Sequence, residues 1–177
     1  MIDTPAALTF RPADDSDLTA LVGLHDGAAR WMLRNGIDQW KPGQKPAAHF
    51  RLRMREGEVW LAEHEGAAVG AYELWWQDEG AWGAQPPVAG YVHRLMTDRT
   101  RAPAGTGRAL LAAAEARIAA CGRPLARLDC VSHNTRLRTY YRTAGYRLVG
   151  ENGAKEAPGG APSYAVTLLE KALTSSS

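Results

Sequence analysis

Apolar residues recur every three or four positions in four stretches of the chain, which is the spacing of one face of a helix. The first helix is predicted to begin at Leu18, because residues 12–17 supply a capping side chain and acids for its first turn. Its apolar stripe runs toward Trp31, and Asn35–Gly36 ends it. The same spacing predicts further helices over residues 47–55, 105–121 and 134–144.

Strand-forming residues with turn residues between them mark the rest of the chain. Residues 59–76 predict a β-hairpin that turns at Glu65–Gly66. Residues 77–90 show no periodicity and contain several Gly and Pro, so we expect a loop there. Further strands are predicted at residues 8–11, 91–97, 125–131, 146–149 and 163–169.

The resulting element order, β-α-α-β-β-β-α-β-α-β-β, predicts the fold class α+β, with a mixed sheet and helices packed against it. The β-α-β unit over residues 91–131 is expected to be parallel and right-handed. The length of 177 residues fits one domain over residues 1–177, with a disordered tail at 174–177. Sheet edges in small α+β proteins are often paired, which allows a homodimer.

Composition is that of a globular protein, with 45% hydrophobic and 23% charged residues. No apolar run is long enough to cross a bilayer, and the N-terminus lacks the pattern of a secretory signal. We therefore predict a cytoplasmic protein without a membrane partner. Cys121 and Cys130 are too few for a disulfide framework and are expected to be reduced packing residues, with a catalytic thiol as the alternative. We predict no metal site.

Positive charge is unevenly distributed, although the net charge is only +2. More than half of the 21 Lys and Arg residues are arginines between positions 94 and 147. Such an excess suits a polyanionic ligand, which can be a nucleotide cofactor or a nucleic acid. The arginines are scattered over two predicted helices rather than concentrated on one recognition helix, so we predict no nucleic-acid partner.

A loop of small residues connects the strand at residues 91–97 to the following helix. Gly105 and Gly107 lie where that helix begins and present no side chain to a ligand. The first amides of a helix are unpaired and lie at its positive end, so a small-residue loop lets them approach a phosphate. Taken alone, the Gly-x-Gly pattern is also typical of a plain tight turn. The Rossmann and Walker patterns are incomplete here.

A second motif follows the strand at residues 125–131. Asn134 is followed seven residues later by Tyr141, and Gly145-Tyr146 begins four residues after that. With the Gly105-Thr106-Gly107 loop upstream, the chain resembles the GNAT superfamily of N-acetyltransferases, in particular bacterial small-molecule members. The resemblance covers nearly the whole element order and implies the GNAT acyl-CoA N-acyltransferase fold, with acetyl-CoA (coenzyme A) as the cofactor.

The resemblance implies the residues that hold the cofactor. The strand at Leu95, Met96 and Thr97 would bind the pantetheine arm and polarise the thioester carbonyl through a backbone N–H. The phosphates would lie on the loop and the start of the helix. The predicted cofactor-binding residues are Leu95, Met96, Thr97, Arg101, Ala102, Pro103, Ala104, Gly105, Thr106, Gly107, Arg108, Asn134 and Tyr141.

One position departs from the family pattern. An Arg or Gln is expected at position 102, but Ala102 stands there, followed by Pro103, which has no N–H to donate. A neighbouring arginine, Arg99, Arg101 or Arg108, would offset the missing contact by pairing with phosphate.

The resemblance also implies direct attack of an amine on the acetyl thioester in a ternary complex. Tyr141 would protonate the leaving thiolate as the general acid, since a Tyr pKa near 10 keeps the hydroxyl protonated at neutral pH. A core aromatic residue is the alternative for this position. Asn134 would contact the cofactor, cap its helix, or do both.

The acceptor amine must lose a proton before it attacks. For an alkylamine of pKa about 10.4, reaching the neutral form at pH 7 costs about 4.6 kcal/mol. His93 lies on the same strand face as Leu95, and Glu73 lies on the hairpin, so either is a candidate base. Ordinary half-exposed strand residues are the alternative for both.

Six Trp residues are many for this length, and most lie outside the cofactor segment. Aromatic walls would suit a cationic or ring-bearing amine, such as an antibiotic, a polyamine or an amino-acid-like compound. Core packing is the alternative role for these indoles. The predicted substrate-binding residues are Trp31, Asp38, Gln39, Trp40 and Trp75. A protein or peptide N-acetyltransferase and a non-catalytic CoA-binding module are the alternatives to a small-molecule enzyme.

Overall fold

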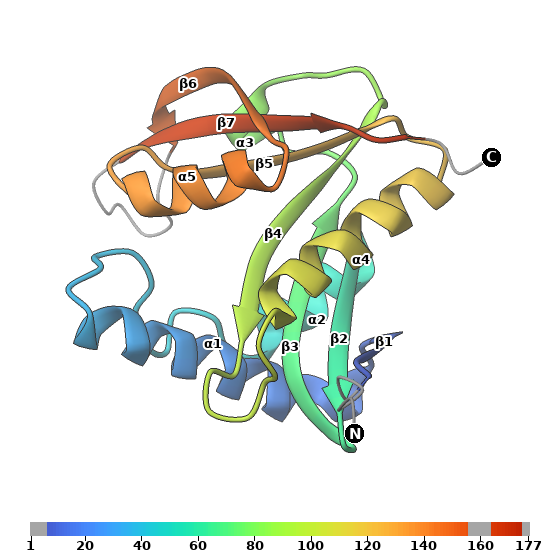
Figure 1. Cartoon of the computed structure of the whole chain (residues 1–177), viewed down its shortest axis with the longest axis vertical. Helices are drawn as coiled ribbons and strands as arrows, with labels where there is room; N and C mark the ends of the chain where they lie inside the picture. Colours follow the sequence, from blue (N-terminus) through green and yellow to red (C-terminus); the bar gives the residue numbers. More distant parts are fainter. Residues whose placement is uncertain (1–6, 156–163, 175–177) are drawn as a thin grey trace, which may run out of the picture. The chain divides into compact units, whose positions relative to one another are not determined.

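The computed structural model describes residues 7–155 and 164–174, and its helices and strands follow the predicted order. The strands are β1 (Thr9–Pro12), β2 (Glu58–His64), β3 (Ala67–Trp75), β4 (Ala89–Thr97), β5 (Leu125–Val131), β6 (Arg147–Lys155) and β7 (Tyr164–Ala172). The helices are the 3-10 turn η1 (Asp15–Asp17), α1 (Leu18–Arg34), α2 (Ala47–Glu56), α3 (Glu79–Trp82), α4 (Thr106–Ala120) and α5 (Thr135–Thr143). Figure 1 shows these elements along the chain.

The strands are ordered β1-β2-β3-β4-β5-β7-β6 in one mixed sheet, which confirms the predicted α+β class. The chain divides into two units. The first unit contains the residues up to Leu74 together with His93–Ala114, and the second contains Trp75–Val92 and the residues from Glu115 onward. Each unit is described by itself below.

In the first unit, β2 and β3 form the predicted hairpin. Its turn is Glu65–Gly66, where both residues have positive φ angles of 51° and 77°. Two successive residues in the left-handed region match the right-handed twist of the flanking strands, which is why Gly is favoured there. α1 and α2 bury their apolar stripes against β2, β3 and Met96. The core consists of Leu18, Leu21, Leu24, Phe50, Val59, Leu61, Ala71 and Met96.

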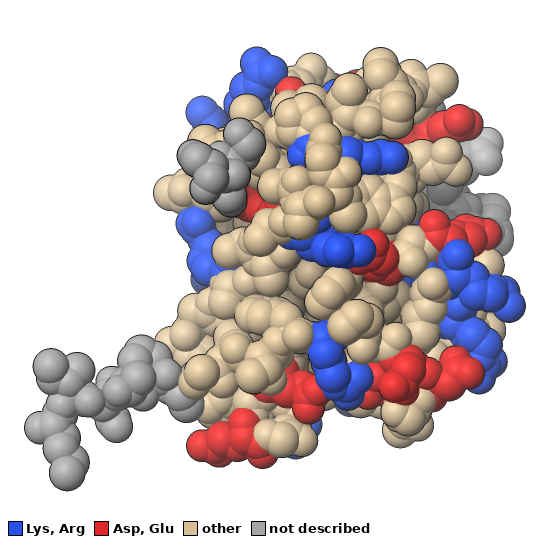
Figure 2. Space-filling view, turned by 90° about the vertical axis from the view of Figure 1, so that its right-hand side faces the viewer, with Lys and Arg blue, Asp and Glu red and all other residues tan. Residues whose placement is uncertain are grey.

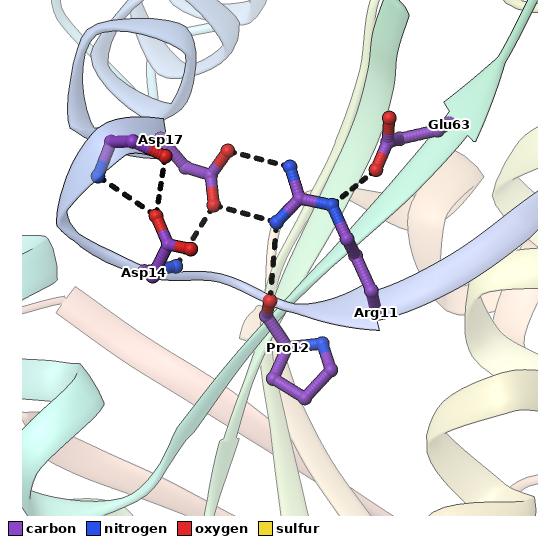
Figure 3. Close-up of polar contacts among 6 residues, drawn as sticks. Arg11, Pro12, Asp14, Asp17 and Glu63 are labelled. Atoms are coloured by element: carbon purple, nitrogen blue, oxygen red, sulfur yellow. Dashed lines mark hydrogen bonds and ion pairs between the residues drawn. The ribbon is translucent and has the colours of Figure 1, made fainter. Parts of the chain in front are cut away.

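The turn before α1 is held by a network of charged groups (Figure 3). Asp14 and Asp17 form a capping box, in which each side chain accepts a hydrogen bond from the other end of the turn. The carboxylate of Asp17 also accepts two hydrogen bonds from the guanidinium of Arg11, at 2.8 and 2.7 Å. Arg11 pairs in addition with Glu63 on β2. The network therefore joins β1, the start of α1 and β2.

The capping network can be tested by replacing Asp17 with alanine. We expect the free energy of unfolding to fall by about 1–2 kcal/mol, because the cap and the pairing of a buried carboxylate with Arg11 are lost together. Asp15→Ala is the matched control, since the Asp15 side chain is 80% exposed. Urea unfolding would measure both variants, and equal effects of the two would contradict a capping role for Asp17.

In the second unit, the start of β4 pairs in parallel with β5, as predicted for the β-α-β unit. β7 lies antiparallel between β5 and β6. Gly90 on β4 leaves room for Ile118 of α4, because an added Cβ would lie 2.4 Å from the Ile118 side chain. The buried guanidinium of Arg127 is paired with Glu170 at 2.8 Å and bonds the hydroxyl of Tyr91 at 2.9 Å. These contacts fix the sheet of this unit.

Several details differ from the predictions. The loop expected at residues 77–90 contains the one-turn helix α3, because the carboxylate of Asp78 accepts from the amide of Ala81 and caps it. β6 runs to Lys155 because it pairs with β7 along its length. Cys130 is buried as expected, whereas Cys121 is exposed and therefore is not a packing residue; both are free thiols.

No helix of the described residues is long and apolar enough to cross a membrane. The tail predicted at residues 174–177 lies outside the described residues, apart from Thr174.

Candidate functional site

The loop between β4 and α4 is shaped by Asp98. Its backbone carbonyl accepts from the amides of Arg101 and Ala102, at 3.2 and 2.8 Å. Its carboxylate accepts from the amide and hydroxyl of Thr100, at 3.0 and 2.7 Å, and pairs with the guanidinium of Arg101 at 3.0 Å. The hydrogen bonds from Thr100, and next the pairing with Arg101, lower the pKa of Asp98 and keep its carboxylate ionised. One aspartate thus folds the loop back on itself.

The start of α4 leaves backbone donors without partners. Among the described residues, the amides of Ala104, Gly105 and Gly107 donate to no protein acceptor. Gly105 has a φ of +84°, a conformation that side-chain-bearing residues rarely adopt, and open space where its Cβ would be. The Thr106 hydroxyl is turned inward and donates to the carbonyl of Pro103 at 2.7 Å. The result is a cluster of amides at the positive end of a 15-residue helix.

A pocket of about 560 Å³ lies in the first unit between α1, the start of β3 and the end of β4. Small residues of α1, among them Gly23 and Gly27, form part of its wall. Trp31 lies on the same helix, and the guanidinium of Arg99 stacks 3.7 Å above its indole ring. Thr97 and Arg101 line the pocket as well. A predicted substrate-binding residue and two predicted cofactor-binding residues therefore face one space.

A second cluster in the first unit surrounds Glu73 on β3, whose side chain is fully buried. Its carboxylate lies 2.8 Å from Nε2 of His49 on α2 and 3.2 Å from Nε of Arg94 on β4. Burial alone raises the pKa of a carboxyl. Here the hydrogen bond with His49 and the charges of Arg94, His49 and His93 outweigh that effect and lower the pKa of Glu73 to about 2.

The remaining predicted acceptor residues lie in different surroundings. Trp40 packs against the core of the first unit, and its ring stacks on that of His25 at 5.2 Å. Asp38 is 87% exposed and pairs with Lys41 at 2.5 Å, and Gln39 is half-buried. None of these three lines the pocket. Trp75 is half-buried in the second unit.

In the second unit, Asn134 caps α5, since its side-chain oxygen accepts from the amide of Leu137 at 3.0 Å. The capping role considered for Asn134 is thereby confirmed. Tyr141 lies on the buried face of α5, packed edge-on against Tyr140 and Tyr146. Burial, with smaller effects from Cys130, Tyr140 and Asp129, raises the pKa of Tyr141 well above its ordinary value. Its hydroxyl therefore stays protonated over the physiological range.

Comparison with known proteins agrees with this arrangement. Residues 29–157 match the family model described as "Acetyltransferase (GNAT) domain". The chain belongs to the GNAT acetyltransferase family. It is also 30% identical over 152 residues to the uncharacterized N-acetyltransferase YesJ of Bacillus subtilis (strain 168), covering 81% of this chain and 83% of that protein. This GNAT chain is thus an acetyl-transferring enzyme by family.

Solved GNAT structures share the fold. A GNAT acetyltransferase from Listeria monocytogenes superposes with a TM-score of 0.74 at 25% identity, covering 94% of this chain and 95% of that one. A GNAT acetyltransferase from Elizabethkingia anophelis, solved with acetyl-CoA bound, has a TM-score of 0.66 at 14% identity, covering 94% and 98%. The predicted GNAT fold and the family's cofactor, acetyl-CoA, are confirmed.

The loop of this GNAT chain fits a ligand with phosphate groups. Its unpartnered amides, those of Ala104, Gly105 and Gly107, are hydrogen-bond donors of the kind that phosphates accept, and Arg101 adds an exposed guanidinium. The departure from the family pattern at Ala102 has a structural counterpart, because its amide is already bonded to the carbonyl of Asp98. The donors open to a phosphate therefore begin at Ala104.

Sequence analysis missed two residues that shape these sites. Asp98 was detectable in principle, because an Asp two residues before a Thr is a common turn-forming arrangement. His49 could not be singled out from the sequence, since a single His on an amphipathic helix matches no motif. Its pairing with Glu73 joins residues 24 positions apart on different elements.

Replacing Gly105 with alanine tests the role of the loop. Alanine is strained at a φ of +84°, so we expect the loop amides to be displaced and the dissociation constant for acetyl-CoA to rise about tenfold. Gly122→Ala is the matched control, because Gly122 follows the other end of α4, has a φ of +79° and is equally open. Isothermal titration would measure both, and unchanged binding in Gly105→Ala would exclude this loop as the phosphate site.

Proposed function

We propose that this GNAT enzyme transfers the acetyl group of acetyl-CoA to a primary amine of a small molecule, by direct attack in a ternary complex. The acetyl thioester supplies an activated acyl group. The neutral amine forms the new C–N bond as the C–S bond breaks. The sulfur takes the bonding electron pair and a proton, and the nitrogen releases one proton to the solvent as the amide forms. The sequence motifs and the pocket of the first unit support this proposal.

The pocket is the observation that carries the small-molecule assignment. Its volume of about 560 Å³ falls in the range of small-ligand sites, about 300–1,000 Å³. Trp31 offers an aromatic wall next to Thr97, at the end of the strand assigned to the pantetheine arm. Arg30, Arg34 and Arg99 also line it, which disfavours a polycationic acceptor. We therefore expect amino-acid-like and ring-bearing amines to react before polyamines.

Other residues keep the roles proposed from sequence. Tyr141 would donate the proton to the leaving sulfur, and its raised pKa supports a hydroxyl that is protonated when the step begins. Leu95, Met96 and Thr97 would hold the pantetheine arm. Asp38, Gln39, Trp40 and Trp75 remain acceptor contacts proposed from the sequence alone, since none of them lines the pocket. We also propose that residues 1–177 work as one domain, since the family match spans residues of both units.

The face of the molecule drawn in Figure 2 gives no support to a nucleic-acid partner. The face drawn in Figure 2 carries acidic and basic side chains next to one another rather than a continuous basic patch. Binding to a phosphate backbone favours a surface of one sign. The arginine excess between positions 94 and 147 instead includes residues that line the pocket, Arg99 and Arg101.

A thiol-release screen tests the proposed function. The acceptors would be free amino acids, 2-phenylethylamine, an aminoglycoside, spermidine and a peptide with a free N-terminus, each with acetyl-CoA. Release with a small amine, and intersecting initial-velocity patterns, would support the proposal. Release with the peptide alone would favour the peptide-acetylating alternative. Release with no amine, or parallel patterns that indicate an acetyl-enzyme, would overturn it.

A further inference from the structure

The acceptor ammonium must give its proton to a base, and the cluster around Glu73 contains an imidazole, that of His49, to which no role has been given so far. Glu73 has no exposed surface, and His49 and Arg94 converge on the same oxygen, Oε2. Its carboxylate therefore cannot reach an acceptor directly. The side chain of His49 is 16% exposed, so the imidazole lies between the buried carboxylate and the surface.

The charge state of Glu73 sets the tautomer of His49. With a pKa of about 2, the carboxylate is ionised at neutral pH and can only accept hydrogen bonds. Nε2 of His49, at 2.8 Å, must then carry the proton that it donates. In the neutral ring, Nδ1 then keeps its lone pair, and no described residue bonds it. An oriented imidazole with one free nitrogen is the form that a general base requires.

Arg94 completes the arrangement. Its guanidinium contacts the same carboxylate and supplies the positive charge that a buried anion needs, so the imidazole is not required as the counter-ion. Arg94 has a positive φ of 47°, which marks an irregularity in β4. It directly precedes Leu95, the first residue of the strand proposed to bind the pantetheine arm. The cluster thus adjoins the segment assigned to the thioester.

We propose that His49 is the general base of the acetyl transfer, with Glu73 as the residue that positions its ring. This inference rests on the proposed function. His49 is not among the residues that line the pocket, so the proton of the acceptor ammonium passes to its Nδ1 through an intervening water, and the electron pair of the broken N–H bond stays on the amine nitrogen. The imidazolium then returns the proton to water. Glu73, predicted from sequence as a base, acts through His49 instead of touching the acceptor.

The ionisable groups of the Glu73 cluster and its neighbours come from four elements. Glu73 lies on β3, and His93 and Arg94 lie on β4. From α1, His25 interacts electrostatically with Arg94, and on α2 itself Arg53 follows one turn later. His93 is 8% exposed, less open than His49, and remains the competing candidate.

The test compares His49→Gln with the wild type, using 2-phenylethylamine as the reference acceptor, or the amine that ranks highest in the screen. We expect kcat at pH 7 to fall at least a hundredfold, with KM for acetyl-CoA unchanged. The wild-type kcat should level off above the ionisation of its base. In His49→Gln, kcat should keep rising with pH until the acceptor amine is itself deprotonated. The ratio of wild-type to variant kcat should therefore become smaller at alkaline pH. A merely structural defect would lower kcat by one factor at every pH.

Two further measurements guard against a folding defect. Added imidazole should restore kcat of His49→Gly at least tenfold, because a free base can replace the missing ring. His64→Gln is the matched control, since His64 lies in the same unit with a side chain that is 14% exposed, and it should keep the wild-type profile. A kcat of His49→Gln that levels off with pH as the wild type does, or no rescue of His49→Gly by imidazole, would overturn the proposal and favour His93.

The dyad can also be tested without an acceptor. Nitrogen-15 NMR of the imidazole should show Nε2 protonated and Nδ1 bare in the neutral ring, and Glu73→Gln should weaken that preference. A neutral ring protonated at Nδ1 would overturn the proposal. This arm stands apart from the proposed function, which fails instead if the wild-type enzyme releases no thiol with any amine.

Discussion

Replacing Glu73 with alanine is expected to lower the free energy of unfolding by about 3–5 kcal/mol. Removing one partner of a buried ion pair leaves the other charge without compensation in a poorly solvated place, and that cost dominates the effect. Here the stranded groups would be the guanidinium of Arg94 and the imidazole of His49. Chemical denaturation near neutral pH would measure the change.

The same carboxylate should make the free energy of unfolding depend on pH in the acidic range. The pKa of Glu73 is depressed from 4.5 to about 2 in the folded state, so its contribution is present above pH 4.5 and is lost as the pH falls toward 2. At one pKa unit per 1.36 kcal/mol, the contribution is about 3 kcal/mol. Subtracting the pH profile of Glu73→Gln from that of the wild type should isolate this loss.

Glu56→Ala is the control for removal of one negative charge. Glu56 lies on α2 of the same unit, its side chain is 58% exposed, and it pairs with Arg53. Exposed ion pairs contribute little, so a change of less than about 1 kcal/mol is expected. If Glu73→Ala were no more damaging than this variant, the cluster would not be the stabilising unit described here.

Tyr141→Phe is expected to lower kcat by tenfold or more with little change in KM. The substitution removes the hydroxyl proposed to protonate the leaving sulfur and keeps the ring that packs against Tyr140 and Tyr146. Thermal unfolding should therefore be nearly unchanged, which separates a catalytic loss from a packing loss. Steady-state thiol release would give kcat and KM.

Tyr140→Phe is the neighbouring control and should retain wild-type kcat. Because the pKa of Tyr141 is raised, its deprotonation should not reduce the rate between pH 7 and 9. An undiminished kcat in Tyr141→Phe would remove this residue from the mechanism. If Tyr141→Phe lowered both thermal stability and kcat, the role of the hydroxyl would instead be structural, in the core of its unit.

Local patterns predicted much of the fold because the interactions that produce them are local. The hairpin turn at Glu65–Gly66 follows from the left-handed conformation that its residues must adopt. The start of α1 follows from the Asp14–Asp17 capping box, and α5 from its Asn134 cap. The one-turn helix α3 was missed because a single capping aspartate, Asp78, within a Gly- and Pro-rich stretch does not stand out.

The candidate site divides in the same way. The Gly105–Gly107 loop and the Asn134–Tyr141 spacing are contiguous motifs, and they were enough to predict the family and its cofactor. The pocket could not be foreseen, because Trp31 on α1 and Arg99 after β4 meet only when both pack against the sheet. The role of Glu73 could not be foreseen either, because its burial depends on elements distant in sequence.

The order of helices and strands, the amide-rich start of α4 and membership of the GNAT family follow from the sequence, since each depends on residues close together along the chain. Which side chain lies against which does not. His49, Glu73 and Arg94 come from α2, β3 and β4, and the desolvation and pairing that give them their properties exist only after those elements pack. Chemistry built from distant residues is therefore set by packing and not by motif.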